Sequence, residues 1–247
     1  MKKEIREVKN GVLQITTYDE RWYARQSVDK VTGLPVYEFV PSVTWIAEHY
    51  PKGIGFYKWL ANKGWDEAEA IKEAAADKGS KVHRAICDLI DSKVVKIDSK
   101  YRNSATEQEE ELTLEEYGAI LSFAEWFKET QPTILERELV VWGDGYAGTV
   151  DLVCAIKNEV WVVDFKTSQQ IWPSHELQVS AYKHALEDSA KYKLAILQLG
   201  YRLNKKKYKF TKLEDKFDLF LAAKKIWANE TNGTMPKQKD YPLEIKL

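Results

Sequence analysis

The chain has 247 residues, of which 44% are hydrophobic and 12% aromatic, so it is long and apolar enough to bury a sizeable core. Lysine and arginine number 37 against 38 aspartates and glutamates, and the net charge of −1 excludes a globally basic nucleic-acid coat, although not a local basic groove. The stretch "MKKEIREVKNG" has no apolar signal-peptide core, and no run approaches the roughly 18 apolar residues of a membrane span, so we expect a cytoplasmic protein with no membrane partner.

The N-terminal part is predicted to contain strands followed by helices. Short strands with turns are expected over residues 11–40, because "DKVTGLP" has turn composition and "VYEFV" is rich in strand-forming residues. The stretch "PSVTWIAEHYP" at 41–51 opens a helix, with Ser42 as its N-cap. Residues 54–78 are predicted to be helical and to end at Gly79.

A second pair of helices is predicted before the middle of the chain. One begins near Ser80 and places apolar residues on one face, namely Val82, Ala85, Ile86, Leu89 and Ile90. Residues 91–111 are polar and aperiodic, which predicts an exposed loop. Helix resumes in "TLEEYGAILSFAEWFKET" and runs up to Pro132.

The middle of the chain changes to strands. Three consecutive strands with short turns at "GDG" and "KN" are predicted over 134–142, 146–156 and 159–166. They are followed by a helix at 174–190, a strand at 193–202, a basic turn, another strand and a last helix at 213–229. Helices, then a small sheet, a helix and further strands predict a mixed α/β domain.

The two cysteines, Cys87 and Cys154, provide neither a disulfide framework nor a four-thiolate metal site. We expect both to pack as small buried hydrophobes. An iron–sulphur cluster held by four cysteines is therefore not expected.

Charged residues interrupt two otherwise apolar strands, at Asp151 in "GTVDLV" and at Asp164 and Lys166 in "VWVVDFKTS". Strand alternation places Asp164 and Lys166 on one face, and a tight hairpin would bring Asp151 beside Asp164. Buried charges are costly unless they are paired or hold a metal. Magnesium prefers oxygen ligands, and a nearby lysine can orient a water or stabilise charge on phosphate. The alternative is a buried ion pair without a metal.

The stretches "GYAGTVDLV", "VWVVDFKTS" and "ELQVSAYKHAL" together resemble the RecB-type branch of the PD-(D/E)xK nuclease superfamily, and most closely its phage and prophage exonucleases. The resemblance covers residues 79–186 well and 41–46 weakly. It implies an α/β fold with a restriction-endonuclease-like core, in which helices flank a mixed central β-sheet, and a helical N-terminal portion. We expect one nuclease domain over 1–247, with a strand and helical portion over about 1–130 and a nuclease core over about 79–230.

The resemblance assigns catalytic roles to the residues that match the family motif. Asp164 and Lys166 match its (D/E)xK element, and Asp151 matches the aspartate of the preceding strand. Val150 stands where the family pattern has proline, a departure that this branch often shows. By the resemblance, Asp151 and Asp164 bind metal and Lys166 positions the attacking water.

Further site residues are implied by the same resemblance. Gln178 and Tyr182 match a glutamine followed four residues later by tyrosine, a spacing that places both on one helical face, where they would orient the site or the scissile strand. His83, in "GSKVH", matches an upstream metal-binding histidine, and the alternative is a packing histidine. The backbone carbonyl of Phe165 is implied as a further metal ligand.

A glutamate on the strand before "GTVD" commonly completes the family site, and two compete for the position. Glu136 and Glu138 are expected on the same strand face, two residues apart. Glu138 fits better, because it keeps the usual distance to Asp151. For Glu136 the alternative is an exposed carboxylate at a strand edge.

Basic and aromatic residues near the C-terminal strands are candidate DNA contacts. The stretch "YRLNKKKYKF" could grip phosphates and stack on unpaired bases through its tyrosines, and its cationic candidates are Arg202, Lys205, Lys206 and Lys207. The alternative is a solvated turn. Trp172 could form part of a strand-separating wedge or could simply pack.

These observations and the resemblance together predict a DNA nuclease that depends on Mg²⁺ or Mn²⁺. An exonuclease that leaves 5′-phosphate and 3′-hydroxyl ends is expected, in phage or prophage DNA recombination, repair or processing. DNA is the expected partner, and a recombination or single-strand annealing protein is a candidate second one. The alternatives are a catalytically inactive DNA-binding or assembly module on the same scaffold and a structure-specific endonuclease.

Overall fold

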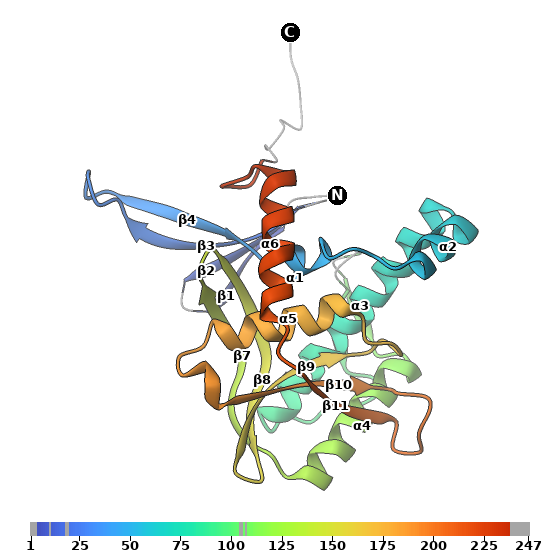
Figure 1. Ribbon diagram of the computed structural model, residues 1–247. Coiled ribbons are helices and arrows are strands. Elements are labelled where there is room, and N and C mark those ends of the chain that lie inside the picture. The colour runs from blue at the N-terminus through green and yellow to red at the C-terminus, as the bar shows by residue number, and fades with distance from the viewer. Residues whose placement is uncertain (1–3, 10, 18–19, 104–105, 107, 238–247) are drawn as a thin grey trace.

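The computed structural model of the chain describes residues 4–9, 11–17, 20–103, 106 and 108–237 (Figure 1). Its central feature is a five-stranded sheet in the order β11-β10-β9-β8-β7. The strands are β7 (Thr133–Gly143), β8 (Tyr146–Ile156), β9 (Glu159–Lys166), β10 (Tyr192–Leu199) and β11 (Tyr208–Leu213). Neighbouring strands are antiparallel except β9 and β10, which run parallel because α5 (Pro173–His184) crosses over between them.

Two tight turns set the register of β7, β8 and β9. Gly145 takes a left-handed φ of 68° between β7 and β8, and the turn between β8 and β9 consists of Lys157 and Asn158, with φ of 49° and 66°. Two consecutive left-handed residues are typical of two-residue hairpin turns that match the strand twist. The tight hairpin predicted at "KN" is therefore confirmed, and it aligns β8 against β9.

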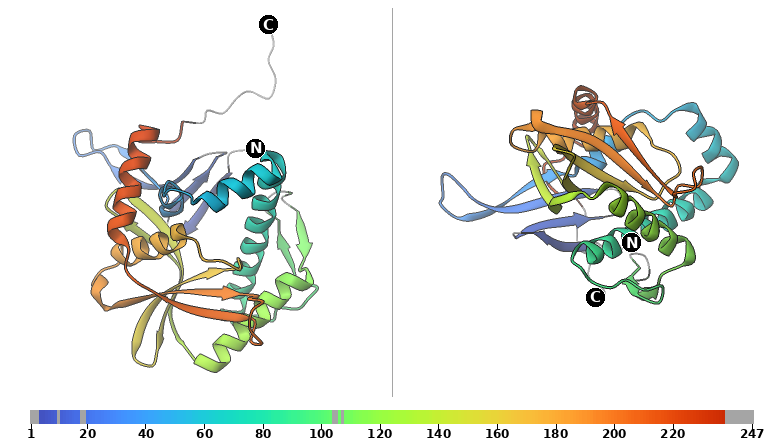
Figure 2. Two further views of the ribbon diagram at one scale, coloured as in Figure 1. Left: turned by 45° about the vertical axis from the view of Figure 1, so that its right-hand side comes forward. Right: turned by 90° about the horizontal axis from the view of Figure 1, so that it is seen from below.

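Helices cover both faces of the central sheet (Figures 1 and 2). Those on one face are α3 (Trp65–Ile90) and α4 (Leu114–Thr130), and those on the other are α5 and α6 (Phe217–Thr231). Alternation along β9 feeds both cores, because Val162 packs on the α5 side while Trp161 and Val163 pack against α3 and α4. The predicted mixed α/β fold, with a mixed central sheet flanked by helices, is confirmed.

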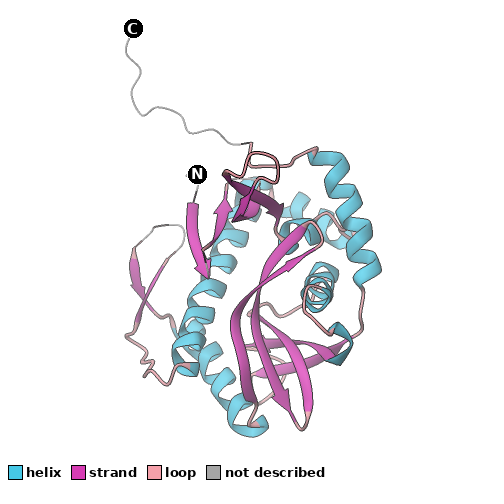
Figure 3. Cartoon of the chain, turned by 90° about the vertical axis from the view of Figure 1, so that its left-hand side faces the viewer, coloured by secondary structure: helices cyan, strands magenta, loops and turns pink. Residues whose placement is uncertain are grey.

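A second, antiparallel sheet precedes the helices (Figure 3). Its strands are β1 (Glu4–Lys9), β2 (Val12–Thr16), β3 (Arg21–Val28) and β4 (Pro35–Pro41), so strands are indeed present over 11–40. A bridge between Ser42 and Ala147 joins this sheet to β8. Trp22 of β3, Trp45 of α1 (Val43–Glu48) and Trp227 of α6 meet edge to face, with ring centroids 5.2 to 5.9 Å apart, and anchor the sheet.

The predicted boundaries of the early helices are wrong in two places. The helix expected over 54–78 is interrupted by Gly64, whose φ of 75° separates α2 (Ile54–Lys63) from α3. No break occurs near Gly79 and Ser80, because α3 continues through both. A glycine costs a helix only about 1 kcal/mol relative to alanine, which the packing of the following apolar turns outweighs.

Other boundaries also differ from the prediction. The expected loop at 91–111 contains a small hairpin of β5 (Lys100–Arg102) and β6 (Glu109–Glu111), strands too short to give a periodic signal. The helix expected to reach residue 190 ends at His184 and is followed by the short 3₁₀ helix η1 (Ser189–Lys191). The last helix begins at Phe217 because Leu213 belongs to β11. None of the described helices is long and apolar enough to cross a membrane.

Candidate active site

β8 and β9 separate at the point where the charged residues lie, which we call the β8–β9 fork. Pairing between these strands ends at Leu152 and Val163, so Asp151 and Asp164 are the next residues on each strand. Beyond this point the Phe165 N–H is bound by a side chain and not by the backbone of β8, because it donates to Oδ2 of Asp151 at 2.7 Å. The sequence prediction that a hairpin brings Asp151 beside Asp164 therefore agrees with the register.

Asp164 and Lys166 lie on the same side of β9 and form an ion pair, with the ammonium 2.8 Å from Oδ2 of Asp164. The Asp164 side chain is 3% exposed and that of Lys166 is 19% exposed. Although this oxygen is close to the ammonium, it receives no well-directed hydrogen bond from the described residues. Burial raises the pKa of Asp164 to about 6 against the opposing charge of Lys166, and repulsion from Asp151 adds to the rise.

Gln178 and Tyr182 hold Lys166 from the other side. The Lys166 ammonium donates to Oε1 of Gln178 at 3.3 Å, and the Gln178 amide nitrogen donates to the Tyr182 hydroxyl at 2.7 Å. The Tyr182 ring is itself fixed against β8, because a Cβ at Gly148 would lie 2.4 Å from its Cε1. The predicted spacing of Gln178 and Tyr182 on one face of α5 thus produces a continuous hydrogen-bonded row.

His83 reaches the β8–β9 fork from α3. Its Nε2 donates to the Phe165 carbonyl at 3.1 Å, and its Nδ1 lies 3.4 Å from Oδ1 of Asp151. Burial lowers the pKa of His83, but the negative charge of Asp151 outweighs it and raises this pKa to about 9. For Asp151 the balance is the reverse, since burial raises its pKa while His83 and Lys166 lower it more.

The structure separates the two candidate glutamates of β7. The register pairs Arg137 with Leu152 and Leu139 with Val150, so Glu138 is placed opposite Asp151. Glu138 has a left-handed φ of 46°, which breaks the alternation that would put both glutamates on one face. Its half-buried carboxylate forms no hydrogen bond or ion pair with a described residue, and burial together with Asp151 raises its pKa.

Glu136 lies at the exposed edge of the sheet. Its carboxylate is 3.4 Å from the ammonium of Lys9 on β1, and both side chains are largely exposed. A bulge between Ile134 and Glu136 precedes it in β7. Its surroundings match the alternative expected for it, a strand-edge carboxylate.

Three predicted metal ligands converge at the β8–β9 fork. Ligand atoms of His83, Glu138 and Asp151 all lie within 4.8 Å of one another. Two carboxylates and an imidazole, one of the carboxylates without a partner in the described part of the chain, form a donor set that fits a divalent cation. Asp164 lies outside this group and is paired with Lys166, and the Phe165 carbonyl contacts His83.

Of the four basic DNA-contact candidates, two are held by acidic residues of α4. Arg202 pairs with Glu115 at 2.8 Å, and Lys206 pairs with Glu129 at 2.6 Å. The other two, Lys205 and Lys207, have no ion pair within the described ranges.

The basic turn and Trp172 border the active-site end of the sheet. The turn follows β10, whose Gln198 is level with Lys166 of β9. Gln169, which lies between β9 and α5, binds the turn that follows β10. Its side chain donates to the Gly200 carbonyl at 3.1 Å and accepts from the Arg202 N–H at 2.9 Å. Trp172 directly precedes α5 and is 47% exposed.

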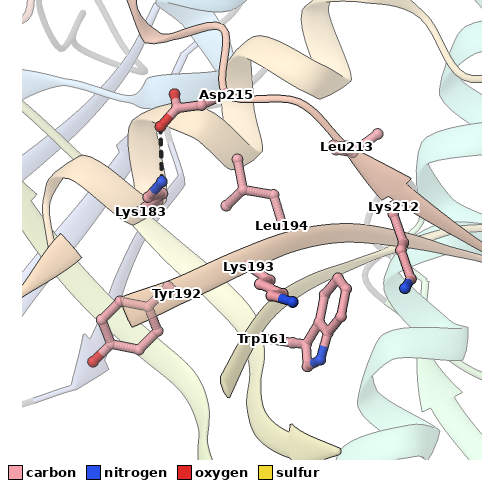
Figure 4. Close-up of a pocket in the computed structure, with 8 residues that line it drawn as sticks. All are labelled: Trp161, Lys183, Tyr192, Lys193, Leu194, Lys212, Leu213 and Asp215. Carbon is pink, nitrogen blue, oxygen red and sulfur yellow. Dashed lines mark hydrogen bonds and ion pairs between the residues drawn. The ribbon is translucent and has the colours of Figure 1, made fainter. Parts of the chain in front are cut away.

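A hollow of about 280 Å³ lies elsewhere on the sheet (Figure 4). Its lining residues are Trp161, Lys183, Tyr192, Lys193, Leu194, Lys212, Leu213 and Asp215. It borders the opposite ends of β9 and β10 from the fork, because Tyr192 and Val160 form the first pair of those strands and Gln198 and Lys166 the last. The hollow is therefore not part of the site.

Both cysteines are free thiols in separate elements, Cys87 on α3 and Cys154 on β8. Burial raises the pKa of each to about 12, and nearby Glu138 adds to the rise for Cys87. Cys154 is buried as expected, whereas Cys87 is only partly buried, and the raised pKa values are those of unreactive thiols. The absence of an iron–sulphur cluster remains a prediction.

His175 is a neighbour of the site to which the sequence reading gave no role. Burial lowers its pKa to about 3, and the charges of Lys166 and Lys52 lower it further, so both ammonium groups act on this ring. Its backbone lies one turn before Gln178 on α5. The spacing of three residues between His175 and Gln178 could have indicated this position from the sequence, because residues three apart lie on the same face of a helix.

A family model described as the PD-(D/E)XK nuclease superfamily matches residues 56–242. The match begins after the N-terminal sheet and spans all of the residues that meet at the β8–β9 fork. No curated protein matches the chain.

Proposed function

The chain belongs to the PD-(D/E)XK nuclease superfamily, and we propose that it is a divalent-metal-dependent deoxyribonuclease that degrades DNA from its ends. The observation that carries this proposal is the meeting of His83, Glu138 and Asp151 within 4.8 Å, beside the Asp164–Lys166 pair. Mg²⁺ or Mn²⁺ is the proposed cation. Hydrolysis leaves 5′-phosphate and 3′-hydroxyl ends, as the RecB-type resemblance implies.

His83, Glu138 and Asp151 would hold the cation, with Asp164 and the Phe165 carbonyl as further donors. When bound, the cation supplies positive charge where the phosphate becomes more negative during hydrolysis. Burying these carboxylates near one another is costly in its absence, because burial, and then repulsion from Asp151, raises the pKa of Glu138 and of Asp164. The same cost favours binding of a cation.

Lys166 positions the attacking water and stabilises charge on the phosphate. Its ammonium is held between Asp164 and Gln178, and it has three N–H donors, so donor capacity remains for substrate. Tyr182 fixes the Gln178 amide, because the amide nitrogen is engaged by the tyrosine and the amide oxygen must then face Lys166. This row of side chains orients the ammonium before substrate arrives.

DNA would approach over the end of the sheet that carries Lys166. The proposed phosphate contacts are Arg202, Lys205, Lys206 and Lys207, and Trp172 would separate the strands. We also propose one domain over 1–247 with its core at about 79–230, a cytoplasmic location and a role in phage or prophage DNA recombination, repair or processing. A recombination or single-strand annealing protein is the proposed partner. The role and the partner rest on the motif resemblance, and the location rests on the sequence composition.

The proposal is tested by incubating the protein and Mg²⁺ or Mn²⁺ with end-labelled linear, nicked and circular DNA. We expect progressive loss of linear DNA from its ends, no attack on closed circles, and no activity in a chelator. Lys166→Ala should lower turnover by about 10²- to 10³-fold and leave DNA binding intact. The control is Lys183→Ala, since Lys183 is 16% exposed and paired with Asp215 at 2.9 Å, an environment similar to that of Lys166 but distant from the fork.

Each other outcome points to a different function. Wild-type turnover by Lys166→Ala contradicts the catalytic assignment. Cleavage of closed circles as fast as of linear DNA indicates the endonuclease alternative. Binding without cleavage by the wild-type protein under all conditions indicates the inactive DNA-binding module.

A further inference from the structure

The stretch "KGIGFYKWLANKGW", residues 52–65, combines aromatic and basic residues without an acidic one, and we call it the aromatic–basic segment. It contains α2 and the first residue of α3, and none of the residues of α2 is buried. Its rings are Phe56, Tyr57, Trp59 and Trp65, and its cations are Lys52, Lys58 and Lys63. The next residues with charge, Asp66 and Glu67, belong to the first turn of α3.

Three rings of this segment, Phe56, Tyr57 and Trp59, contact one another, and none of the four is buried. The Phe56 and Tyr57 rings meet edge to face at 5.7 Å between centroids, and the Phe56 and Trp59 rings are tilted at 5.8 Å. Tyr57 is 53% exposed, Trp65 is 61% exposed and Ile54 is 72% exposed. An exposed cluster of large rings on a helix that buries none of its residues is typical of a binding surface.

Two of the three cations in the segment are available for a ligand. Lys63 is paired with Glu67 at 2.6 Å. Lys52 and Lys58 have no ion pair within the part of the chain that the structure describes. Tyr57 and Lys58 are consecutive on α2 and both exposed, so the helix presents a ring and a cation within one turn. Rings next to unpaired cations fit a strand of bases joined by phosphates.

The segment leads away from the active site. At its start, Lys52 and the catalytic Lys166 both act on the ring of His175, which follows Trp172 at the start of α5. At its end, Trp65 opens α3, on which His83 lies 18 residues further along, or about 27 Å at the helical rise. In Figures 1 and 2, α2 lies at the far end of α3 from the lower part of the central sheet.

We propose that the aromatic–basic segment binds the single-stranded part of the DNA substrate as it enters or leaves the site. Unpaired bases stack on the exposed rings, and Lys52 and Lys58 contact phosphates. Single-stranded DNA is favoured over duplex because base pairing and stacking hide the faces of the bases. A second copy fits less well, since a twofold contact through this face would bring its lysines together. The inference rests on the proposed nuclease function.

The test is binding of a fluorescein-labelled oligothymidylate of about 20 nucleotides, followed by anisotropy in EDTA so that the DNA is not cut. Tyr57→Ala should weaken binding at least about fivefold, the effect of losing one base stack. The matched control is Tyr37→Ala, because Tyr37 is 54% exposed on β4, and it should bind as the wild-type protein does. Binding of a blunt duplex should change less than twofold in both variants.

A second variant and two further measurements keep the test decisive. Tyr57→Phe retains the ring and should bind as tightly as the wild-type protein, while circular dichroism confirms that the variants are folded. Unchanged oligothymidylate binding by folded Tyr57→Ala overturns the inference. Light scattering that shows a wild-type dimer broken by Tyr57→Ala, with DNA binding unchanged, also overturns it and assigns the surface to a second copy.

The two proposals fail separately. Oligothymidylate binding in EDTA requires neither metal nor Lys166, so it tests the segment alone. Wild-type turnover by Lys166→Ala would overturn the catalytic assignment and leave the binding result unaffected. Normal oligothymidylate binding by Tyr57→Ala would overturn the proposal that the aromatic–basic segment binds single-stranded DNA, and it would leave the proposed nuclease activity unaffected.

Discussion

Lys81 and His83 are two residues apart on α3, yet each belongs to a different group of charged side chains. The side chains point in different directions because two residues correspond to about 200° around a helix. Lys81 lies 2.9 Å from Glu116, 3.3 Å from Asp77 and 3.4 Å from Glu110. We call these four residues the Lys81 group.

The carboxylates of the Lys81 group have additional partners, whereas one carboxylate at the fork, that of Glu138, is left open. Glu116 also accepts the Thr113 N–H at 2.7 Å as part of a capping box. Glu138, by contrast, has no hydrogen bond or ion pair to a described residue. In the Lys81 group, the charged side chains bind one another and stabilise the fold. At the fork, the Glu138 carboxylate keeps oxygens that can still bind a ligand.

The largest effect is expected at the fork. Asp151→Asn should lower cleavage by about 10³-fold, because it removes a charged ligand from the group of three. Isothermal titration with Mn²⁺ should show weaker binding, and urea unfolding should show a folded protein. Unchanged Mn²⁺ affinity of Asp151→Asn would contradict the assignment of Asp151 to the metal site.

Lys81→Met should mainly affect stability. Its side chain is 5% exposed, and removal of the ammonium leaves carboxylates uncompensated, at a cost of about 3 kcal/mol in the free energy of unfolding. Urea denaturation measures this change, and cleavage per folded molecule should remain that of the wild-type protein. A loss of turnover without a loss of stability would mean that the two groups on α3 are not distinct.

The stability that Lys81 contributes should depend on pH, which further distinguishes the Lys81 group from the fork. Burial lowers the pKa of Lys81, but Glu116 and then Asp77 outweigh it and raise this pKa above its ordinary value. The stabilisation is therefore fully present below about pH 10.4, the pKa of an unfolded lysine, and is lost as pH rises through the folded value. The stability difference between wild type and Lys81→Met should be equal at pH 7 and pH 9 and smaller near pH 11. A difference that grows with pH contradicts this assignment.

Glu138 and Glu136 provide a matched pair on one strand. Glu138→Gln should raise the Mn²⁺ concentration for half-maximal cleavage by about 10- to 100-fold, because it removes an unpaired carboxylate beside Asp151. Glu136→Gln should leave the midpoint unchanged, since this carboxylate faces Lys9. Equal shifts in the two variants would remove Glu138 from the site.

The smallest effect is expected for His83→Ala, an increase of about tenfold in the same midpoint. Because its pKa is raised to about 9, His83 must release a proton before it can bind a cation, and a neutral imidazole then contributes less than a carboxylate to the binding of a hard cation. A histidine that only packs would instead lower the free energy of unfolding and leave the metal midpoint unchanged. Metal titration and urea unfolding of the same variant therefore separate the two roles.

Local pattern was sufficient to predict the charged residues of the hairpin. Alternation placed Asp164 and Lys166 together, and the short turn at Lys157 and Asn158 fixed their register against Asp151. Both features depend on residues close in sequence, so they can be derived without the rest of the fold.

Features that depend on distant contacts could not be predicted in this way. Glu138 was preferred because of its distance to Asp151 in the family pattern, but the bulge and the positive φ in β7 that separate it from Glu136 have no signal in the residue types there. The helix boundary near Gly79 was wrong because tertiary packing of α3 outweighs the weak helix propensity of glycine. His83 was found through the family motif, since a helix about 70 residues away gives no local signal.

The two oxygens of Asp151 also bear on how this position changes as such proteins diverge. Oδ2 closes the β8–β9 fork by accepting the Phe165 N–H at 2.7 Å, while Oδ1 faces His83. A descendant that abandoned cleavage would still need an acceptor for that N–H, whereas the ammonium of Lys166 would be needed only while Asp164 stays beside it. Loss of activity in a lineage should thus leave aspartate or asparagine at position 151 long after positions 164 and 166 have changed together.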